Sequence, residues 1–189
     1  MDETQVLEFY KELYFFQHAR RDNLDGRLTL PVGVITLLAG AVLFFLKQDA
    51  STKVLAAYVI LVTSLAAAAA LMMACVYFVR ALYNHTYHHL PTLQELQEYR
   101  KTLADQASDY AAALQAYHAK YPNAPAPTRA VPKPEERLQE FLIGELAKGE
   151  DYNVNTNNRK SGLLHRGHSF LVGALALLLV SALAYVASI

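Results

Sequence analysis

The sequence predicts an all-α integral membrane protein with three transmembrane helices and a polar helical extension. Three runs, residues 28–46, 54–79 and 170–189, contain no Asp, Glu, Lys, Arg or His. At about 1.5 Å of rise per residue they measure roughly 28–39 Å, and the hydrocarbon core of a bilayer is about 30 Å thick. Of the 189 residues, 53% are hydrophobic and the formal net charge is zero, so we expect no direct binding to nucleic acid.

Residues 1–27 are expected to form an amphipathic helix. Val6, Phe9, Leu13 and Phe16 recur at spacings of three and four, which is the period of one helical face. The aromatic content suits a helix that lies on the inner leaflet of the membrane. The alternative is a helix that packs on the protein's own core, and both interpretations stay open.

Residues 28–79 are expected to form a transmembrane hairpin, with spans at 28–46 and 54–79. The connector 47–53 is so short that the two spans must be antiparallel. Small residues at regular spacing let helices approach closely, either within one subunit or between subunits. The candidates for this role are Gly33, Gly40, Ala66, Ala70 and Ala74.

Residues 80–166 are expected to form a cytoplasmic helical region. Thr92 and Glu95 have the spacing of a capping box, which starts a helix. From there apolar and aromatic residues recur every three or four positions, which predicts a coiled-coil seam; they include Leu96, Leu103, Tyr110 and Tyr117. The seam's partner is either the chain's own next helix or a second copy of this one.

A proline-rich linker at 121–134 separates this helix from the next, which is expected from Glu135. The asparagine-rich stretch 152–160 is poor helix material. It is either a break or a place where the amide side chains are hydrogen-bonded against the base of the hairpin. A third transmembrane helix follows at 167–189, so the soluble part forms a helical hairpin between the second and third spans.

The distribution of positive charge predicts the orientation. Of the 17 Lys and Arg residues, only Lys47 and Lys53 lie between the first two spans, and none follows the third. The positive-inside rule therefore places the amino terminus inside and the carboxyl terminus outside.

The histidines are the only cluster that suggests chemistry. His85, His88 and His89 are spaced to share one helical face after the second span, and His165 and His168 precede the third. Together they are weak candidates for a metal site. The HTYHH run also resembles one histidine box of membrane di-iron desaturases, which implies a histidine-metal membrane enzyme as a remote alternative. We otherwise expect no enzyme, no catalytic residue and no cofactor.

The layout as a whole resembles the small SLATT-type multi-span membrane effectors of bacterial anti-phage systems, including those that accompany retrons and nucleotide-signalling operons. The features that carry the resemblance are the aromatic first helix, Arg20, Arg21 and Asp22 before a membrane hairpin, and the coiled helix behind it. It implies a homo-oligomeric protein of the bacterial inner membrane that contacts lipid, receives a signal from a cytoplasmic protein partner and permeabilises the membrane. The alternative is a membrane anchor that recruits a soluble enzyme through its cytoplasmic helices.

Overall fold

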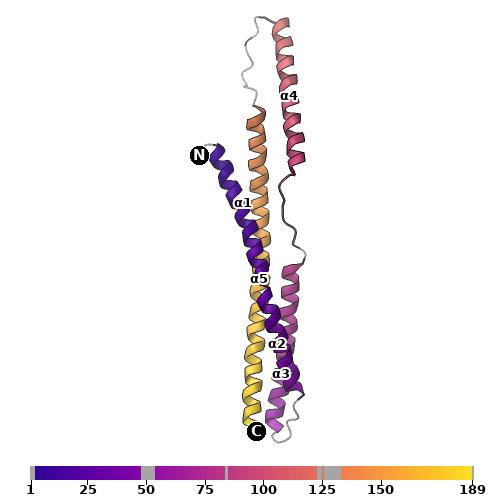
Figure 1. The fold of residues 1–189 in the computed structure, drawn as a ribbon, viewed down its shortest axis with the longest axis vertical. Helices are drawn as coiled ribbons and strands as arrows, with labels where there is room; N and C mark the ends of the chain where they lie inside the picture. Colours follow the sequence, from indigo (N-terminus) through magenta and orange to yellow (C-terminus); the bar gives the residue numbers. More distant parts are fainter. Residues whose placement is uncertain (1–2, 48–53, 84, 123–124, 126–132, 189) are drawn as a thin grey trace. The chain divides into compact units, whose positions relative to one another are not determined.

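The computed structural model describes residues 3–47, 54–83, 85–122, 125 and 133–188. These residues form five helices and no strand, so the predicted all-α class is confirmed for this part of the chain (Figure 1). The helices are α1 (Glu3–Gly26), α2 (Thr29–Leu46), α3 (Val54–Leu82), α4 (Leu93–Lys120) and α5 (Pro134–Ser188). The predicted connector 47–53 and linker 121–134 lie largely outside the described residues.

The chain divides into two compact units. The first, which we call the polar unit, comprises Met1–Gln17 and Tyr87–Asn153. The second, the apolar unit, comprises His18–Thr86 and Val154–Ile189. Because α1 and α5 each continue from one unit into the other, both units are built from segments that lie far apart in the sequence.

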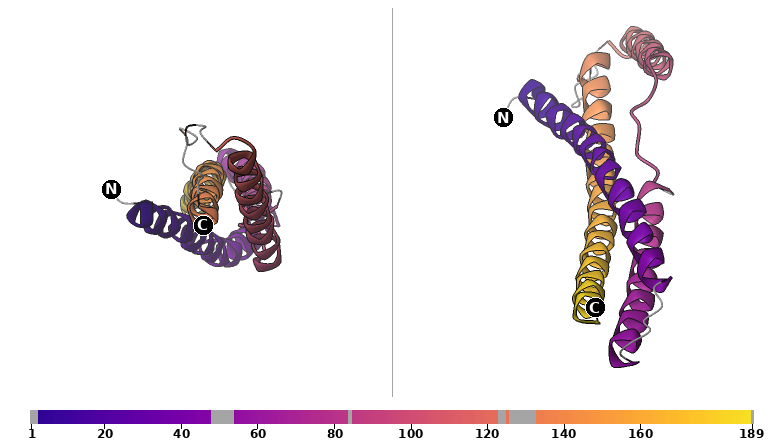
Figure 2. Two further views of the ribbon diagram at one scale, coloured as in Figure 1. Left: turned by 90° about the horizontal axis from the view of Figure 1, so that it is seen from above. Right: turned by 60° about the horizontal axis from the view of Figure 1, so that its bottom comes forward.

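In the apolar unit, α2 and α3 form an antiparallel hairpin beside the second half of α5 (Figure 2). The buried positions of α3 recur in alternating steps of four and three: Ile60, Ser64, Ala67, Leu71, Ala74, Phe78 and Ala81. The second half of α5 has the same period, with Leu164, Leu171, Ala174, Leu178 and Ser181 buried. This spacing is that of helices that pack nearly parallel, with the side chains of one helix between those of the next.

The outward faces of these helices are apolar. Leu30, Leu55 and Leu183 are 78%, 77% and 71% exposed. Three helical stretches of the described chain, Thr4–Leu46, Val54–Leu82 and Pro134–Ser188, are long and apolar enough to cross a membrane. An aqueous solvent would penalise so much exposed apolar surface, whereas lipid does not. The structure thus supports a membrane-spanning protein with three transmembrane helices.

The hydroxyl groups inside the apolar unit satisfy one another. Thr63 Oγ1 lies 2.6 Å from Ser181 Oγ, and Ser64 Oγ lies 3.3 Å from the same atom. Both Thr63 Oγ1 and Ser181 Oγ also lie within hydrogen-bonding distance of a backbone carbonyl of their own helix. Because each hydroxyl has one proton, one of the two donates to the other hydroxyl while its partner donates to its own carbonyl. An unpaired hydroxyl is costly in hydrocarbon, so this cluster fixes the register of α3 against α5.

In the polar unit, α4 packs against the first part of α5. The rings of Tyr99 and Phe141 lie 4.5 Å apart, and Leu103 and Leu146 are buried. The predicted capping box is confirmed: Thr92 accepts a hydrogen bond from the Glu95 amide, and the Glu95 carboxylate accepts one from the Thr92 amide. The first turn of α4 is therefore stabilised by its own sequence.

The chain itself covers the predicted apolar face of the first helix only in part, since Val6 and Leu13 are partly buried. Phe9 and Phe16 are 49% and 60% exposed, and α1 instead buries Tyr14 and Gln17. Hydrogen bonding explains the exchange for Tyr14, because its hydroxyl donates to the backbone carbonyl of His88 and accepts from the amide of Leu90. Apolar periodicity alone does not detect a polar side chain that is buried with partners.

The asparagine-rich stretch does not break α5, which runs without interruption for 55 residues. Asn153 is fully buried, and its side chain accepts from the amide of His88 at 2.9 Å and donates to the carbonyl of the same residue. Of the two alternatives left open by the sequence, the hydrogen-bonded one holds at this position. The amide supplies the backbone partners that the non-helical residue His88 lacks.

Candidate anion-binding pocket

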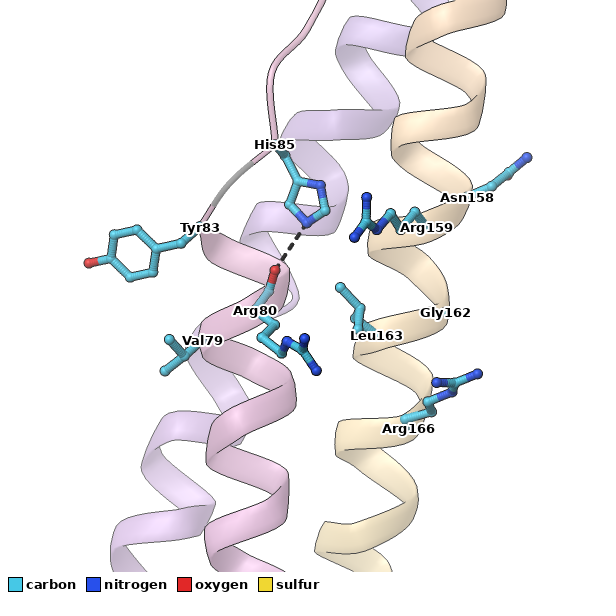
Figure 3. A pocket seen from close by; sticks show the side chains of 9 residues that line it. All are labelled: Val79, Arg80, Tyr83, His85, Asn158, Arg159, Gly162, Leu163 and Arg166. Carbon is cyan, nitrogen blue, oxygen red and sulfur yellow. Dashed lines mark hydrogen bonds between the residues drawn. The ribbon is translucent and has the colours of Figure 1, made fainter.

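A pocket of about 540 Å³ lies between the end of α3 and the middle of α5, wholly within the apolar unit (Figure 3). The uncharged run of α3 ends at Val79, and the next residue, Arg80, lines the pocket. On α5 the pocket extends over two helical turns, from Arg159 to Arg166. The two α5 arginines in the lining, Arg159 and Arg166, precede the uncharged run that begins at Phe170, so the pocket lies where both helices change from polar to apolar.

The pocket follows from the helical period of α5. Arg159, Leu163 and Arg166 lie at positions i, i+4 and i+7, which share one face of a helix. Gly162 adds no side chain to this face, and a Cβ atom there would meet no other atom within 4 Å. In the close-up, the side chains of Arg80 and Arg159 extend into the space between α3 and α5, with the ring of His85 beside them (Figure 3).

The charge of the pocket is unbalanced. Within the described part of the chain, the guanidinium groups of Arg80, Arg159 and Arg166 form no salt bridge. The nearby Asp25 carboxylate is engaged by the buried ammonium group of Lys160. Three uncompensated cations around one cavity create a positive potential that attracts an anion.

His85 closes the pocket at the non-helical segment. Its Nε2 lies 3.1 Å from the carbonyl oxygen of Arg80, and a carbonyl only accepts, so Nε2 carries the proton. Burial lowers the pKa of His85 below its ordinary value of 6.5, and the positive charges of Lys160 and Arg159 lower it further. The bond to the Arg80 carbonyl and the charge of Asp25 oppose this shift. At neutral pH the ring is therefore an uncharged hydrogen-bonding group.

A second polar cluster lies in the polar unit and is structural. Besides the bonds of Tyr14 and Asn153 to its backbone, His88 has its Nε2 at 3.7 Å from the Glu145 carboxylate. Gly149 permits this arrangement, because a Cβ atom there would lie 3.0 Å from both His88 Nδ1 and the ring of Tyr14. The cluster connects the extended segment to α1 and α5.

The five candidate histidines do not form a metal centre. The prediction that His85, His88 and His89 share a helical face is wrong, because residues 85–92 are not helical. His165 and His168 line a different pocket, beside Arg27, and His168 Nδ1 lies 2.7 Å from the carbonyl of Leu164. Among the described residues, no three His, Cys, Asp or Glu side chains come together as a metal ion requires.

The candidate assembly residues fall into two groups. One group lies in the chain's own interior or near it: Ala74 and Leu103 are buried, and Ala70 and Leu96 are partly buried. The other group is exposed: Gly33, Gly40, Ala66, Tyr110 and Tyr117. Ala74 and Leu103 thus pack within one chain, and the exposed group offers its surface to another molecule.

The sequence pattern drew attention to the histidines beside the apolar runs. It did not predict that Arg80, Arg159 and Arg166 line one pocket. The signal was present in the sequence, because Arg80 directly follows one apolar run and Arg159 and Arg166, seven residues apart, precede another. Their convergence required the pairing of α3 with α5, which no sequence pattern specified. Comparison with protein-family models, with curated proteins and with solved structures gives no match for this chain.

Proposed function

We propose that this protein is a non-enzymatic membrane subunit that assembles with copies of itself and disturbs the bilayer when its polar helices receive a signal. The resemblance to small anti-phage effectors supplies the biological setting, a bacterial inner membrane and a partner protein from the same system. In this proposal the polar unit lies in the cytoplasm, as the distribution of Lys and Arg predicts.

The observation that carries the proposal is an uncovered stripe on the second half of α4. Leu103 is 5% exposed because the chain's own polar unit covers it. Further along the same seam, Tyr110 and Tyr117 are 42% and 48% exposed. The apolar stripe therefore extends beyond the part that the chain's own side chains bury. Tyrosines at heptad spacing supply large contact areas for a partner helix, and a second α4 offers the matching stripe.

The membrane helices offer a second surface of the same kind. Gly33 and Gly40 lie seven residues apart on α2, and a Cβ atom at either position would meet no other atom within 4 Å. Internal packing therefore does not require glycine at these positions. A neighbouring helix from another copy would benefit from the close approach that glycine allows.

The test measures the particle mass of the detergent-purified full chain. We expect a closed assembly of several copies, and we expect Tyr110→Glu combined with Tyr117→Glu to reduce its mass, because two carboxylates cannot be buried in a helix seam without partners. Ala112→Glu combined with Ala119→Glu is the matched control, since it adds the same charge at the same spacing on a different face of α4. Equal masses for both variants would contradict the role of the stripe.

A membrane anchor is the second candidate, because the same stripe also suits the helix of a different protein. The two functions differ in what the chain does alone. Expression of an effector should collapse the membrane potential, read with a potential-sensitive dye, whereas an anchor should leave it intact. A monomer in detergent together with an intact potential would favour the anchor.

A further inference from the structure

The arginine pocket has the chemistry and the depth of a site for an anionic lipid. We propose that Arg80, Arg159 and Arg166 bind the phosphate of an anionic phospholipid headgroup, with the acyl chains along the apolar surfaces of α3 and α5. The inference rests on the membrane insertion included in the proposed function and is independent of self-assembly.

The first argument is charge and geometry. Guanidinium groups donate paired hydrogen bonds to phosphate oxygens. Those of Arg80 and Arg159 extend into the space between α3 and α5, and Arg166 belongs to the lining seven residues further along α5 (Figure 3). None of the three has a carboxylate partner among the described residues. The Asp25 carboxylate, whose charge acts on His85, already pairs with Lys160. The site therefore has a net positive charge that a phosphate would neutralise.

The second argument is depth. On α3 the lining includes Val79, the last residue of the uncharged run, and on α5 it reaches Arg166, four residues before the uncharged run that begins at Phe170. The exposed surfaces of both runs are apolar. Tyr83, also in the lining, is 70% exposed, which suits a tyrosine at the level of the headgroups. Basic pockets between transmembrane helices at this level are typical sites for anionic headgroups.

The third argument is space. A volume of about 540 Å³ lies within the usual range for sites that hold small organic groups. The open space above Gly162 leaves room for a headgroup beside the helix. A soluble phosphate compound would satisfy the arginines as well, but it would leave the exposed apolar surfaces of α3 and α5 uncovered.

The first experiment measures lipid binding to the detergent-purified full chain by native mass spectrometry. Phosphatidylglycerol is the anionic probe and phosphatidylcholine the zwitterionic one. We expect tighter binding of phosphatidylglycerol, weakened at least about tenfold in the triple variant Arg80→Gln, Arg159→Gln, Arg166→Gln, as follows from the attraction of basic residues to anionic lipid. The control variant Arg100→Gln, Lys101→Gln, Arg137→Gln removes the same charge from the polar unit and should bind as the wild type does.

A second variant tests the cavity without changing its charge. Gly162→Phe fills the open space and should weaken phosphatidylglycerol binding, whereas Gly144→Phe, at another α5 glycine with no neighbouring atom, should not. Particle mass, recorded in the same spectra, reports on assembly separately from lipid binding. Unchanged phosphatidylglycerol binding in both the triple variant and Gly162→Phe would overturn the proposed site.

The wild-type chain provides a test that does not depend on the folding of any variant. Phenylglyoxal modifies accessible arginines, and peptide mass spectrometry reads each position. We expect phosphatidylglycerol to protect Arg80, Arg159 and Arg166 but not Arg100 or Arg137. Equal protection by inorganic phosphate or by ATP at the same concentration would overturn the assignment to lipid and indicate a soluble phosphate compound, and equal protection by phosphatidylcholine would overturn the requirement for an anionic headgroup.

Discussion

His85 shows how burial decides the charge of a single residue in this protein. Its folded pKa lies below 6.5, chiefly because burial disfavours the charged ring, and secondarily because Lys160 and Arg159 are positive. Between the folded pKa and 6.5, the unfolded chain binds more protons than the folded one. The contribution of His85 to the free energy of unfolding therefore rises with pH through this interval and is reduced on acidification below about 6.5.

We predict that Arg159→Gln raises the pKa of His85 but leaves it below 6.5, because the larger cause, burial, remains. An NMR titration of the histidine ring protons in detergent micelles measures this value. Arg137→Gln, distant in sequence and outside the pocket lining, should leave the pKa unchanged. A fall in the pKa of His85 after Arg159→Gln, or an equal change in both variants, would contradict the assignment of the electrostatic neighbours.

At the scale of elements, the close approach of α3 and α5 near Phe78 requires a glycine on α5. A Cβ atom at Gly167 would lie 2.7 Å from a ring atom of Phe78, well inside van der Waals distance. Phe78 is buried and packs edge-on against His168, so its ring has little room to move. The two helix backbones can approach here only because the position has no side chain.

We predict that Gly167→Ala lowers the free energy of unfolding by about 1–3 kcal/mol, the usual cost of overpacking an interior. Thermal unfolding in detergent, followed by circular dichroism, measures the effect. Gly173→Ala is the control, because it lies on the same helix with no atom within 4 Å of its added Cβ, and it should be neutral or slightly stabilising. The same loss of stability in both variants would show that helix propensity or flexibility, and not the contact with Phe78, governs α5.

At the scale of the whole molecule, the orientation in the membrane can be tested by labelling single introduced cysteines. Cys75 is the only cysteine, so Cys75→Ser gives a background without thiols. In that background we predict that a cysteine introduced by Ser188→Cys reacts with a membrane-impermeant maleimide in intact cells, and that one introduced by Ser108→Cys reacts only after permeabilisation. The physical reason is the distribution of Lys and Arg, from which the positive-inside rule predicts that the segment between the second and third spans is cytoplasmic. Labelling in the opposite order would reverse the orientation and leave the three spans in place.

The polar unit illustrates the limit of sequence patterns. Periodicity predicted the start of α4, because a capping box is local and involves only Thr92, Glu95 and their own backbone. In α1 it did not indicate that Gln17 is buried while the neighbouring Phe16 is exposed. A buried polar residue is decided by partners that lie far away in the sequence, and no window of one helix contains them.

The sequence by itself determined the membrane-spanning class, because the cost of placing charge in hydrocarbon depends only on the composition and length of a run. It also determined the all-α class of the described chain and the position of each long apolar helix. Only the tertiary structure decided that Arg80, Arg159 and Arg166 share one pocket, that His85 and His88 lie in a non-helical segment, and that Leu103 is internal while Tyr110 is not. These facts depend on which helix lies beside which, and that choice is made by the sum of many weak contacts between distant segments.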